Sequence, residues 1–305
     1  MGRRRNKGRA VSGWVVLDKP VGMTSTQAVA AMRRMFDVSK AGHAGTLDPL
    51  ASGCLPIALG EATKAVPQIF EGRKVYRFAV GWGVETDTDD SEGRVVATSD
   101  ARPTRDAILA ALPDYVGEIS QVPPAYSAIK VDGERAYDLA RDGETVTLEA
   151  RTVVVHRLTL MDMPDKNTAV FETECGKGTY VRALARDIGR SLGTHGHVTA
   201  LRRLSVGPFT EEELVPFDAI REAHAANGPE ASDAFLRPIE AALRQMTEVM
   251  LPQGDAAKVL RGQAVLLRGR TAPLAGEAYA TGAGRLLALG DIEAGSFHPR
   301  RVFNL

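Results

Sequence analysis

The sequence predicts an α+β fold followed by a small β-rich unit. Strand-like runs of apolar, aromatic and β-branched residues occur together with segments whose apolar residues recur at helical spacing. The last part of the chain, residues 251–305, is punctuated by glycines, rich in strand-forming residues and too short for more than a compact barrel. A chain of 305 residues has room for one large domain and a small one, or for two comparable ones.

The first elements follow from local patterns. Residues 13–18 have the apolar character of a buried strand, which Lys19-Pro20 ends. The run Thr24-Ser25-Thr26 offers N-caps to a helix over residues 27–36, where apolar residues recur at helical spacing. Three further elements are predicted: a short strand at 55–59, a short helix at 62–70 and an aromatic, β-branched strand at 75–82.

The middle of the chain contains two segments with more than one interpretation. Residues 85–93 resemble a calcium-binding loop, but the turn glycine falls one place late and no glutamate closes the loop. A hairpin turn is therefore predicted there. Residues 121–143 form a polar, proline-punctuated connection of a length that is usually functional or mobile. Beyond them the patterns predict strands at 145–161 and 169–175, a helix at 183–192 and a helical stretch at 217–246.

The composition is that of an ordinary soluble globular protein, with 44% hydrophobic and 25% charged residues. No apolar run approaches the ~20 residues of a membrane span, and the N-terminus lacks the apolar core of a signal peptide. We therefore expect a cytoplasmic protein without membrane contact. Cys54 and Cys175 are too few for a disulfide framework or a cysteine-rich zinc site, and we expect reduced core thiols.

Positive charge is concentrated at the N-terminus, although the formal net charge is zero. The first ten residues contain five basic side chains and no acidic one, so the remainder is net acidic by five. A basic arm of this kind can bind a phosphate backbone or serve as a disordered, solubilising tail. Both interpretations stay open.

A glycine-rich loop at residues 42–53 holds a single carboxylate. Its acid is Asp48, with His43 and Thr46 before it and Pro49 after it. Glycines allow a tight turn or a close approach to a ligand, and surface loops often carry functional side chains. An aspartate before proline also commonly begins a turn, and local chemistry alone favours that simpler interpretation.

Eight separated segments carry a resemblance to a known family. In chain order they are Leu17–Ser25, Gly42–Gly53, Gly60–Lys64, Lys74–Tyr76, Thr86–Asp90, Val122–Lys130, Gly178–Arg182 and His197–Leu204. Together these segments resemble the TruB family of tRNA pseudouridine synthases. The end of the chain, with Gly262-Gln263 and Pro299–Phe303, looks like that family's PUA-like RNA-binding domain.

The resemblance implies a pseudouridine synthase fold, a mixed and mostly antiparallel sheet with flanking helices and an active-site cleft. It divides the chain into a basic tail (1–10), a catalytic domain (11–248) with a thumb-like loop at about 121–143, and a PUA-like domain (249–305). It further implies an isomerase that converts uridine-55 in the tRNA T loop to pseudouridine without metal or organic cofactor. The expected partner is tRNA, through its T stem-loop and elbow, and the protein is expected to be a monomer.

The reaction breaks the N1–C1′ bond of uridine, turns the base and rejoins it through C5. A carboxylate can attack carbon and leave again, and Asp48 matches the family's nucleophile. Attack on C1′ and elimination toward a glycal both stay open. Arg182 matches the residue that pairs with this aspartate, since a nearby cation favours an ionised carboxylate. Asp90 is either a second carboxylate oriented by Arg182 or simply a hairpin-turn acid.

Other residues match positions that handle the base. Tyr76 matches the residue that stacks on the target base, where its phenol is a plausible proton acceptor from C2′ or C5. Tyr180 and Leu201 match residues that line the base pocket, although Leu201 also suits a core position. Uridine-55 must be everted before Asp48 can reach it, and His43 matches the residue that takes the place of the flipped base.

Four more residues are expected to support the site or the RNA. The resemblance implies that Lys19 and Pro20 buttress the active site and that Lys64 reaches phosphate. Lys130 would add positive charge to the thumb-like loop, while a solvated position is the alternative for such surface lysines.

Two other functions compete with this interpretation. A tRNA-binding or RNA-folding factor would open the tRNA elbow without modifying it. A metal-dependent hydrolase would use the acids of residues 87–92, but no histidine–carboxylate set in the sequence has convincing ligand spacing. We therefore predict no metal site.

Overall fold

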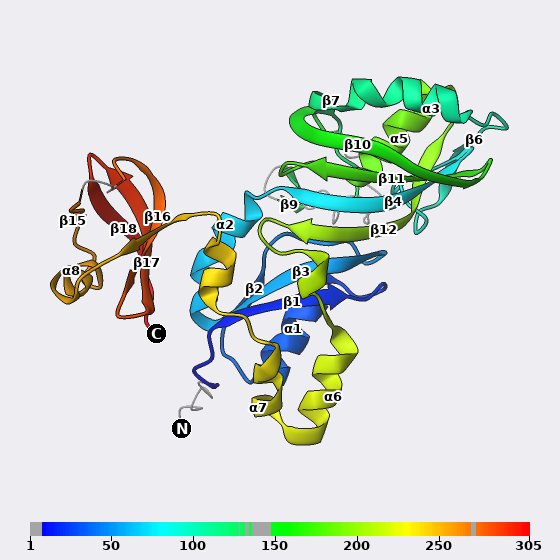
Figure 1. Cartoon of the computed structure of the whole chain (residues 1–305). Helices are drawn as coiled ribbons and strands as arrows, with labels where there is room; N and C mark the ends of the chain where they lie inside the picture. The colour runs from blue at the N-terminus through cyan, green and yellow to red at the C-terminus, as the bar shows by residue number, and fades with distance from the viewer. Residues whose placement is uncertain (1–7, 128, 132–133, 136–147, 270–272) are drawn as a thin grey trace. The chain divides into compact units, whose positions relative to one another are not determined.

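The computed structural model describes residues 8–127, 129–131, 134–135, 148–269 and 273–305, and Figure 1 shows their elements. The chain forms two compact units. Unit 1 consists of residues 1–48, 54–70 and 206–305, and unit 2 of residues 49–53 and 71–205.

Unit 1 begins with a buried strand and a capped helix. Strand β1 (Gly13–Lys19) is buried along almost its whole length, as its apolar run predicts. Helix α1 (Ser25–Met35) starts at a capping box in which Thr24 and Gln27 each bond the other's backbone N–H, so the predicted N-cap is confirmed. Strand β1 lies between β13 (Val215–Pro216), to which it is parallel, and β3 (Ala51–Leu59), and β2 (Ala41–His43) pairs antiparallel with β3.

The other helical segments of unit 1 are short. The helix predicted over residues 62–70 is a 3-10 turn followed by a single α-helical turn. The stretch predicted over 217–246 is interrupted, since Gly228 has a left-handed φ of +78° and Pro229 lacks a backbone donor. The segments are η1 (Gly60–Ala65), α2 (Val66–Phe70), η3 (Glu211–Glu213), α6 (Phe217–Asn227), α7 (Pro229–Ser232), η4 (Asp233–Phe235) and η5 (Ile239–Leu243).

The predicted β-rich end of the chain is confirmed as a β half-barrel. Its strands follow the order β14-β16-β17-β18-β15, and all pairs except the parallel β14–β16 are antiparallel. Gly290 lets β17 and β18 approach closely, because a Cβ there would lie 2.2 Å from the carbonyl oxygen of His298. The sequence did not predict the helix α8. The elements are β14 (Thr247–Met250), α8 (Gln253–Val259), β15 (Val265–Leu266), β16 (Gly276–Gly282), β17 (Arg285–Glu293) and β18 (Ser296–Val302).

Unit 2 is built on a sheet in the order β12-β4-β11-β10-β7, in which the pairs β4–β11, β11–β10 and β10–β7 are antiparallel. The rings of Phe78 and Phe171 stack at 5.4 Å in its core. The first residues of β3 join this sheet in parallel, with Ala51 opposite Leu201. The predicted mixed and mostly antiparallel sheet is therefore confirmed. Its strands are β4 (Lys74–Trp82), β7 (Gly117–Gln121), β10 (Arg151–Asp165), β11 (Thr168–Cys175) and β12 (Gly196–Val206).

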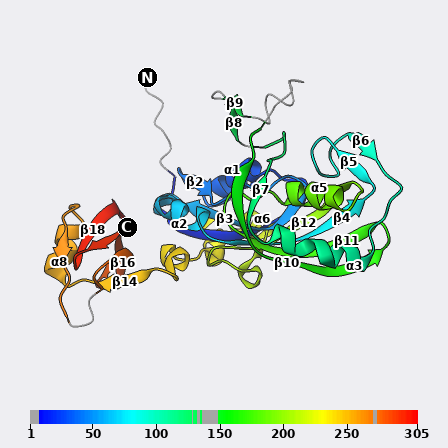
Figure 2. The same ribbon diagram turned by 90° about the horizontal axis from the view of Figure 1, so that it is seen from above.

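Helices and hairpins of unit 2 complete the fold. Helix α5 (Val181–Ser191) contacts β4, and α3 (Arg105–Ala111), which the sequence did not predict, contacts β10 and continues into η2 (Leu112–Tyr115). The predicted hairpin at residues 85–93 is confirmed as β5 (Val84–Thr86) and β6 (Val95–Thr98). Figure 2 shows the short pair β8 (Lys130–Val131) and β9 (Glu134–Arg135) standing out from the sheet.

Two predicted segments lie partly outside the described residues. Of the basic tail, residues 8–10 are described: Gly8 bridges to Val38, and Arg9 bonds the carboxylate of Asp233 with both terminal nitrogens. Of the thumb-like loop, residues 121–127, 129–131 and 134–135 are described. Among the helices of the described residues, none has both the length and the apolar character that a bilayer crossing needs.

Candidate active site

The loop that carries Asp48 is anchored at the residue before it. Residues 44–50 connect β2 to β3, and Asp48, which belongs to unit 1, is half-buried. The buried hydroxyl of Ser25, at the start of α1, donates to the carbonyl oxygen of Leu47 at 3.0 Å and accepts from its N–H at 2.9 Å. One hydroxyl therefore satisfies both backbone groups of Leu47. The position of Asp48 along the loop is fixed by the N-terminus of a helix.

Glycine is required in this loop where the backbone turns. Gly45 has a φ of +92° and Gly53 a φ of +99°, a region that side chains disfavour. A Cβ on Gly53 would also lie 2.3 Å from the carbonyl oxygen of Arg203. The glycines of the motif thus shape the loop and allow β3 to begin against β12.

Lys19 and Pro20 form a closed turn in unit 1. The ammonium of Lys19 is completely buried and donates to the carbonyl oxygens of Pro20 at 2.8 Å and Met23 at 2.7 Å. Gly22, with a φ of +84°, allows the chain to reverse between them. These bonds hold the turn that leads into α1, whereas the ring of Pro20 itself is exposed.

His43 and Lys64 also lie in unit 1. His43 is the half-buried last residue of β2, with its Cα opposite that of Ile57. The ammonium of Lys64 donates to Glu61 at 2.6 Å and to the carbonyl oxygen of Val302 at 2.7 Å. Burial opposes ionisation of Glu61, but its bonds with Lys64 and the Asn304 N–H outweigh it and lower the pKa of Glu61. The expected phosphate contact of Lys64 stays a prediction, and these bonds make it less favourable.

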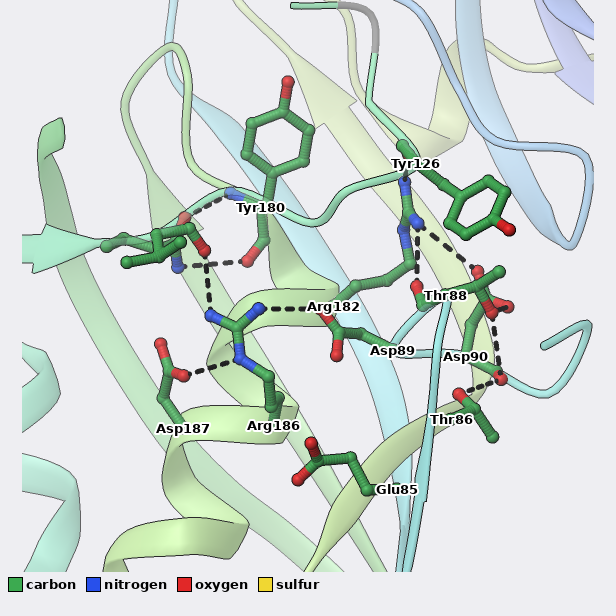
Figure 3. A network of polar contacts seen from close by, with 12 residues as sticks. Glu85, Thr86, Thr88, Asp89, Asp90, Tyr126, Tyr180, Arg182, Arg186 and Asp187 are labelled. Carbon is green, nitrogen blue, oxygen red and sulfur yellow. Dashed lines mark hydrogen bonds and ion pairs between the residues drawn. The ribbon is translucent and has the colours of Figure 1, made fainter. Parts of the chain in front are cut away.

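Arg182 lies at the start of α5 in unit 2, and its guanidinium is almost completely buried. It donates to the carbonyl oxygen of Thr88 and to that of Tyr126, both at 2.9 Å. Its Nη1 lies 3.6 Å from Oδ2 of Asp90. Figure 3 shows Arg182 reaching the segment around Thr88 and Asp90 on one side and Tyr126 on the other. Asp90, the second carboxylate considered for Arg182, thus lies beside that guanidinium, whereas the pairing of Arg182 with Asp48 stays a prediction.

The two oxygens of the Asp90 carboxylate have different partners. Its Oδ1 accepts from the Thr88 hydroxyl at 2.6 Å and from the Glu92 N–H at 3.0 Å, which closes the hairpin turn. Its Oδ2 is the atom nearest to Arg182. Thr86 adds a bond to the Asp90 carbonyl oxygen at 2.6 Å. The turn function and the pairing with Arg182, which were alternatives in the sequence, coexist.

The N-terminus of α5 is fixed by a buried glutamine. Gln121 accepts from the N–H of Tyr180 at 2.8 Å and donates to its carbonyl oxygen at 3.1 Å. Tyr180 itself is half-buried, as is Tyr76, whose Cα lies opposite Thr173 on β11. Leu201 is buried on β12. Lys130 belongs to β8, and its side chain lies outside the described part of the chain.

Helix α5 carries a row of charged side chains that was not predicted from the sequence. Arg182, Arg186 and Arg190 follow one another at four-residue spacing, so they share one face of the helix. Arg186 donates to Asp89 at 2.8 Å, and Arg190 donates to Glu85 at 2.6 Å. The spacing of the arginines is visible in the sequence. Their acidic partners, Asp89 and Glu85, lie about one hundred residues earlier in the chain, in the reverse order of Arg186 and Arg190.

The pKa values of Asp89 and Lys74, both buried in unit 2, are shifted. Burial raises the pKa of Asp89 to about 6, although the charge of Arg186 opposes the shift. Burial and the charge of Arg203 lower the pKa of Lys74 to about 8, and its ammonium donates to the carbonyl oxygen of Gly72 at 2.6 Å. Within the described ranges, the histidines, cysteines and acids form no group of three arranged to hold a metal.

Comparisons with known proteins identify the family. Residues 33–181 match the model of the TruB family pseudouridylate synthase N-terminal domain. Residues 182–244 match that of the tRNA pseudouridylate synthase B C-terminal domain. The tRNA pseudouridine synthase B of Bradyrhizobium diazoefficiens is 62% identical over 99% of this chain and 88% of its own length. The chain belongs to the TruB family. It is a pseudouridine synthase, an isomerase.

Other relatives support the same assignment. The TruB-family protein of Agrobacterium fabrum, also called tRNA pseudouridine synthase B, is 54% identical over 98% of this chain and 97% of its own length. A chain in the crystal structure of a Cbf5-Nop10-Gar1 complex has a TM-score of 0.73 at 26% identity. That likeness covers 96% of this chain and 85% of the other. The TruB assignment therefore extends over nearly the whole chain.

Proposed function

We propose that this protein converts uridine-55 in the T loop of tRNA to pseudouridine, with Asp48 as the nucleophile. The relatives named tRNA pseudouridine synthase B support tRNA as the substrate. The observation that carries the proposal is the environment of the Arg182 side chain. Its buried guanidinium donates to two carbonyl oxygens and lies beside the carboxylate of Asp90. A cation held in this way can receive and orient a second carboxylate, and Asp48 matches the family residue that would supply it.

The chemistry requires a carboxylate that is presented in one position. Asp48 either attacks C1′ or drives elimination toward a glycal, and both routes begin with its carboxylate close to the ribose. The Ser25 bonds to Leu47 limit the movement of the loop, so Asp48 needs little reorganisation when substrate arrives. In this proposal, as the family resemblance implies, Arg182 orients that carboxylate. The base leaves N1, turns and bonds through C5, so no atom is gained or lost.

The remaining residues handle the RNA in this proposal. His43 fills the place of the everted base, and Tyr76 stacks on that base with its phenol available for proton transfer. Tyr180 and Leu201 line the base pocket. Lys130 and the thumb-like loop grip the T stem-loop, and the β half-barrel adds contacts to the tRNA elbow. The protein works as a monomer and requires neither metal nor organic cofactor.

One experiment tests the reaction and its site together. The protein is incubated with unmodified tRNA in the absence of metal and cofactor, and pseudouridine is mapped along the RNA. We expect product at position 55 alone. Product at another position, or dependence on an added metal, would contradict the proposal.

The matched variant Asp48→Asn tests the nucleophile. We expect no pseudouridine, with a tRNA dissociation constant within about threefold of the parent's, because the amide keeps the shape but not the nucleophilicity. Pseudouridine formed by Asp48→Asn would contradict the assignment of Asp48 as the nucleophile. Intact tRNA refolding by the same variant would favour the competing function, a tRNA-folding factor.

A further inference from the structure

A second buried arginine on α5 lies beside the one that the proposed reaction uses. Arg186 is only 8% exposed, and its charge partner Asp89 is 5% exposed. Its Nη1 donates to Asp89, its Nη2 to the carbonyl oxygen of Val122, and its Nε to Asp187, each at 2.8 Å. All three nitrogens of the guanidinium are therefore engaged, and the side chain has one position.

Arg186 and Arg182 bind the same two segments of unit 2. Arg182 donates to Thr88 in the β5–β6 hairpin and to Tyr126 in the segment after β7. Arg186 binds the next residue of the hairpin, Asp89, and the same later segment at Val122. In Figure 3 the guanidinium of Arg186 lies lower and further to the left than that of Arg182, and each is bonded to the Thr88–Asp90 segment. Arg186 thus bonds to both segments that supply the acceptors of Arg182.

The backbone at Asp89 couples the Arg186 bonds to the groups that face Arg182. Asp89 has a φ of +60°, and its carbonyl oxygen accepts from the N–H of Val198 at 3.0 Å. Thr88 and Asp90 are its direct neighbours, so a shift of Asp89 moves the carbonyl and the carboxylate that face Arg182. Loss of the Arg186 bonds would change the position of Arg182 without removing any group that touches the substrate.

We propose that Arg186 and Asp89 are positioning residues for pseudouridine formation, which set Arg182 through the Thr86–Asp90 turn and the Val122–Tyr126 segment. The inference rests on the role of Arg182 in the proposed function. Neither residue is a catalytic residue in this view. We expect Arg186 and Asp89 to affect the rate of the chemical step. This effect should vanish when the guanidinium of Arg182, which they position, has been replaced.

The test compares Arg186→Lys with a matched control, Arg190→Lys. Both arginines lie on the same face of α5 and bind an acid of the same hairpin, but in the described part of the chain Arg190 has only Glu85 as acceptor and is half exposed. A lysine at 186 keeps the charge but cannot reach three acceptors at once. We expect the single-turnover rate of Arg186→Lys to fall by about 10- to 100-fold and its tRNA dissociation constant to change less than about threefold. Arg190→Lys should stay within about twofold of the parent in both.

A double variant separates positioning from a general loss of structure. In an Arg182→Lys background, adding Arg186→Lys should lower the rate by less than about twofold, because the group that it positions is already gone. Equal losses in both backgrounds, or a parent-like rate for Arg186→Lys, would overturn the inference. If Arg186→Lys does not fold, as judged by circular dichroism, Asp89→Asn is measured in the same two backgrounds and judged by the same criteria. A parent-like rate for Arg182→Lys alone would instead contradict the proposed function.

Discussion

Arg182 is surrounded by acceptors that need its planar fork. Its two terminal nitrogens reach carbonyl oxygens on different segments, and the same group faces Asp90. A lysine would place one point charge where two separated donors are required. Burial makes the loss more costly, since the carbonyls of Thr88 and Tyr126 would lack their partner. Geometry at this residue, rather than charge alone, is what the site requires.

Arg182→Lys should therefore impair the chemical step more than binding. We expect the single-turnover rate on tRNA to fall by about 100-fold while the dissociation constant stays within about threefold. Rapid-quench assays with excess enzyme measure the first quantity and filter binding the second. Equal rates for variant and parent would refute the prediction.

Asp89 makes the stability of the protein depend on pH. Its pKa is raised to about 6 by burial against the opposing charge of Arg186. The folded protein thus keeps a proton that the unfolded chain releases near pH 4, and the free energy of unfolding falls as the pH rises from about 4 to about 6. Asp89→Asn removes this titration and leaves the other carboxylates in place.

The difference between the two proteins isolates the effect of Asp89. Relative to Asp89→Asn, the parent's free energy of unfolding should decrease by about 1–3 kcal/mol between pH 4 and pH 7. Urea unfolding of both proteins at the two pH values measures it. A difference that is the same at both pH values would show that Asp89 titrates alike in the folded and unfolded states.

At the scale of elements, helix α1 performs two tasks with neighbouring residues. Thr24 caps the helix through exposed bonds with Gln27, whereas Ser25 is buried and bonds both backbone groups of Leu47. One residue stabilises the helix itself, and the next fixes the loop that ends at Asp48. The two tasks can be separated by mutation.

Ser25→Ala and Thr24→Ala should differ in their effect on activity. Thr24→Ala should cost about 1 kcal/mol of unfolding free energy without changing the single-turnover rate. Ser25→Ala leaves two buried backbone groups without a partner, so it should cost about 1–3 kcal/mol and also slow the reaction, by about tenfold. Thermal unfolding and single-turnover assays of both variants provide the comparison. A parent-like rate for Ser25→Ala would mean that the loop is held by other contacts.

At the scale of the whole molecule, residues 60–64 meet the end of the chain. Lys64 and Glu61 bond residues Val302 and Asn304, and the Lys64 ammonium lies 5.9 Å from the ring centroid of Phe303. Residues 60–64 are one of the segments that resemble the TruB family. Through Lys64 they bond to a part of unit 1 that lies more than two hundred residues later in the chain.

Lys64→Gln distinguishes this structural tie from a phosphate contact. Because the ammonium is already bonded, we expect the salt dependence of tRNA binding to keep the parent's slope, whereas losing a phosphate contact would reduce that slope by about one. The free energy of unfolding should fall by about 1 kcal/mol. Binding measured at several salt concentrations, together with urea unfolding, checks both. A reduced slope would restore the phosphate assignment.

The sequence by itself determined the elements with strong local signals and the order of the motifs. The caps of α1, the strand at 75–82, the hairpin at 85–93 and the β-rich end depend on patterns within a few residues, so they could be predicted. The broken stretch after Phe217 and the helix α3 were not predicted, since glycine, proline and burial against other elements decided them. Only the tertiary structure decided that Arg186 meets Asp89, that Lys64 binds Val302 and that Ser25 holds Leu47. Such pairs join residues that are 22 to 238 positions apart, and strand register and helix packing, rather than any local pattern, bring them within bonding distance.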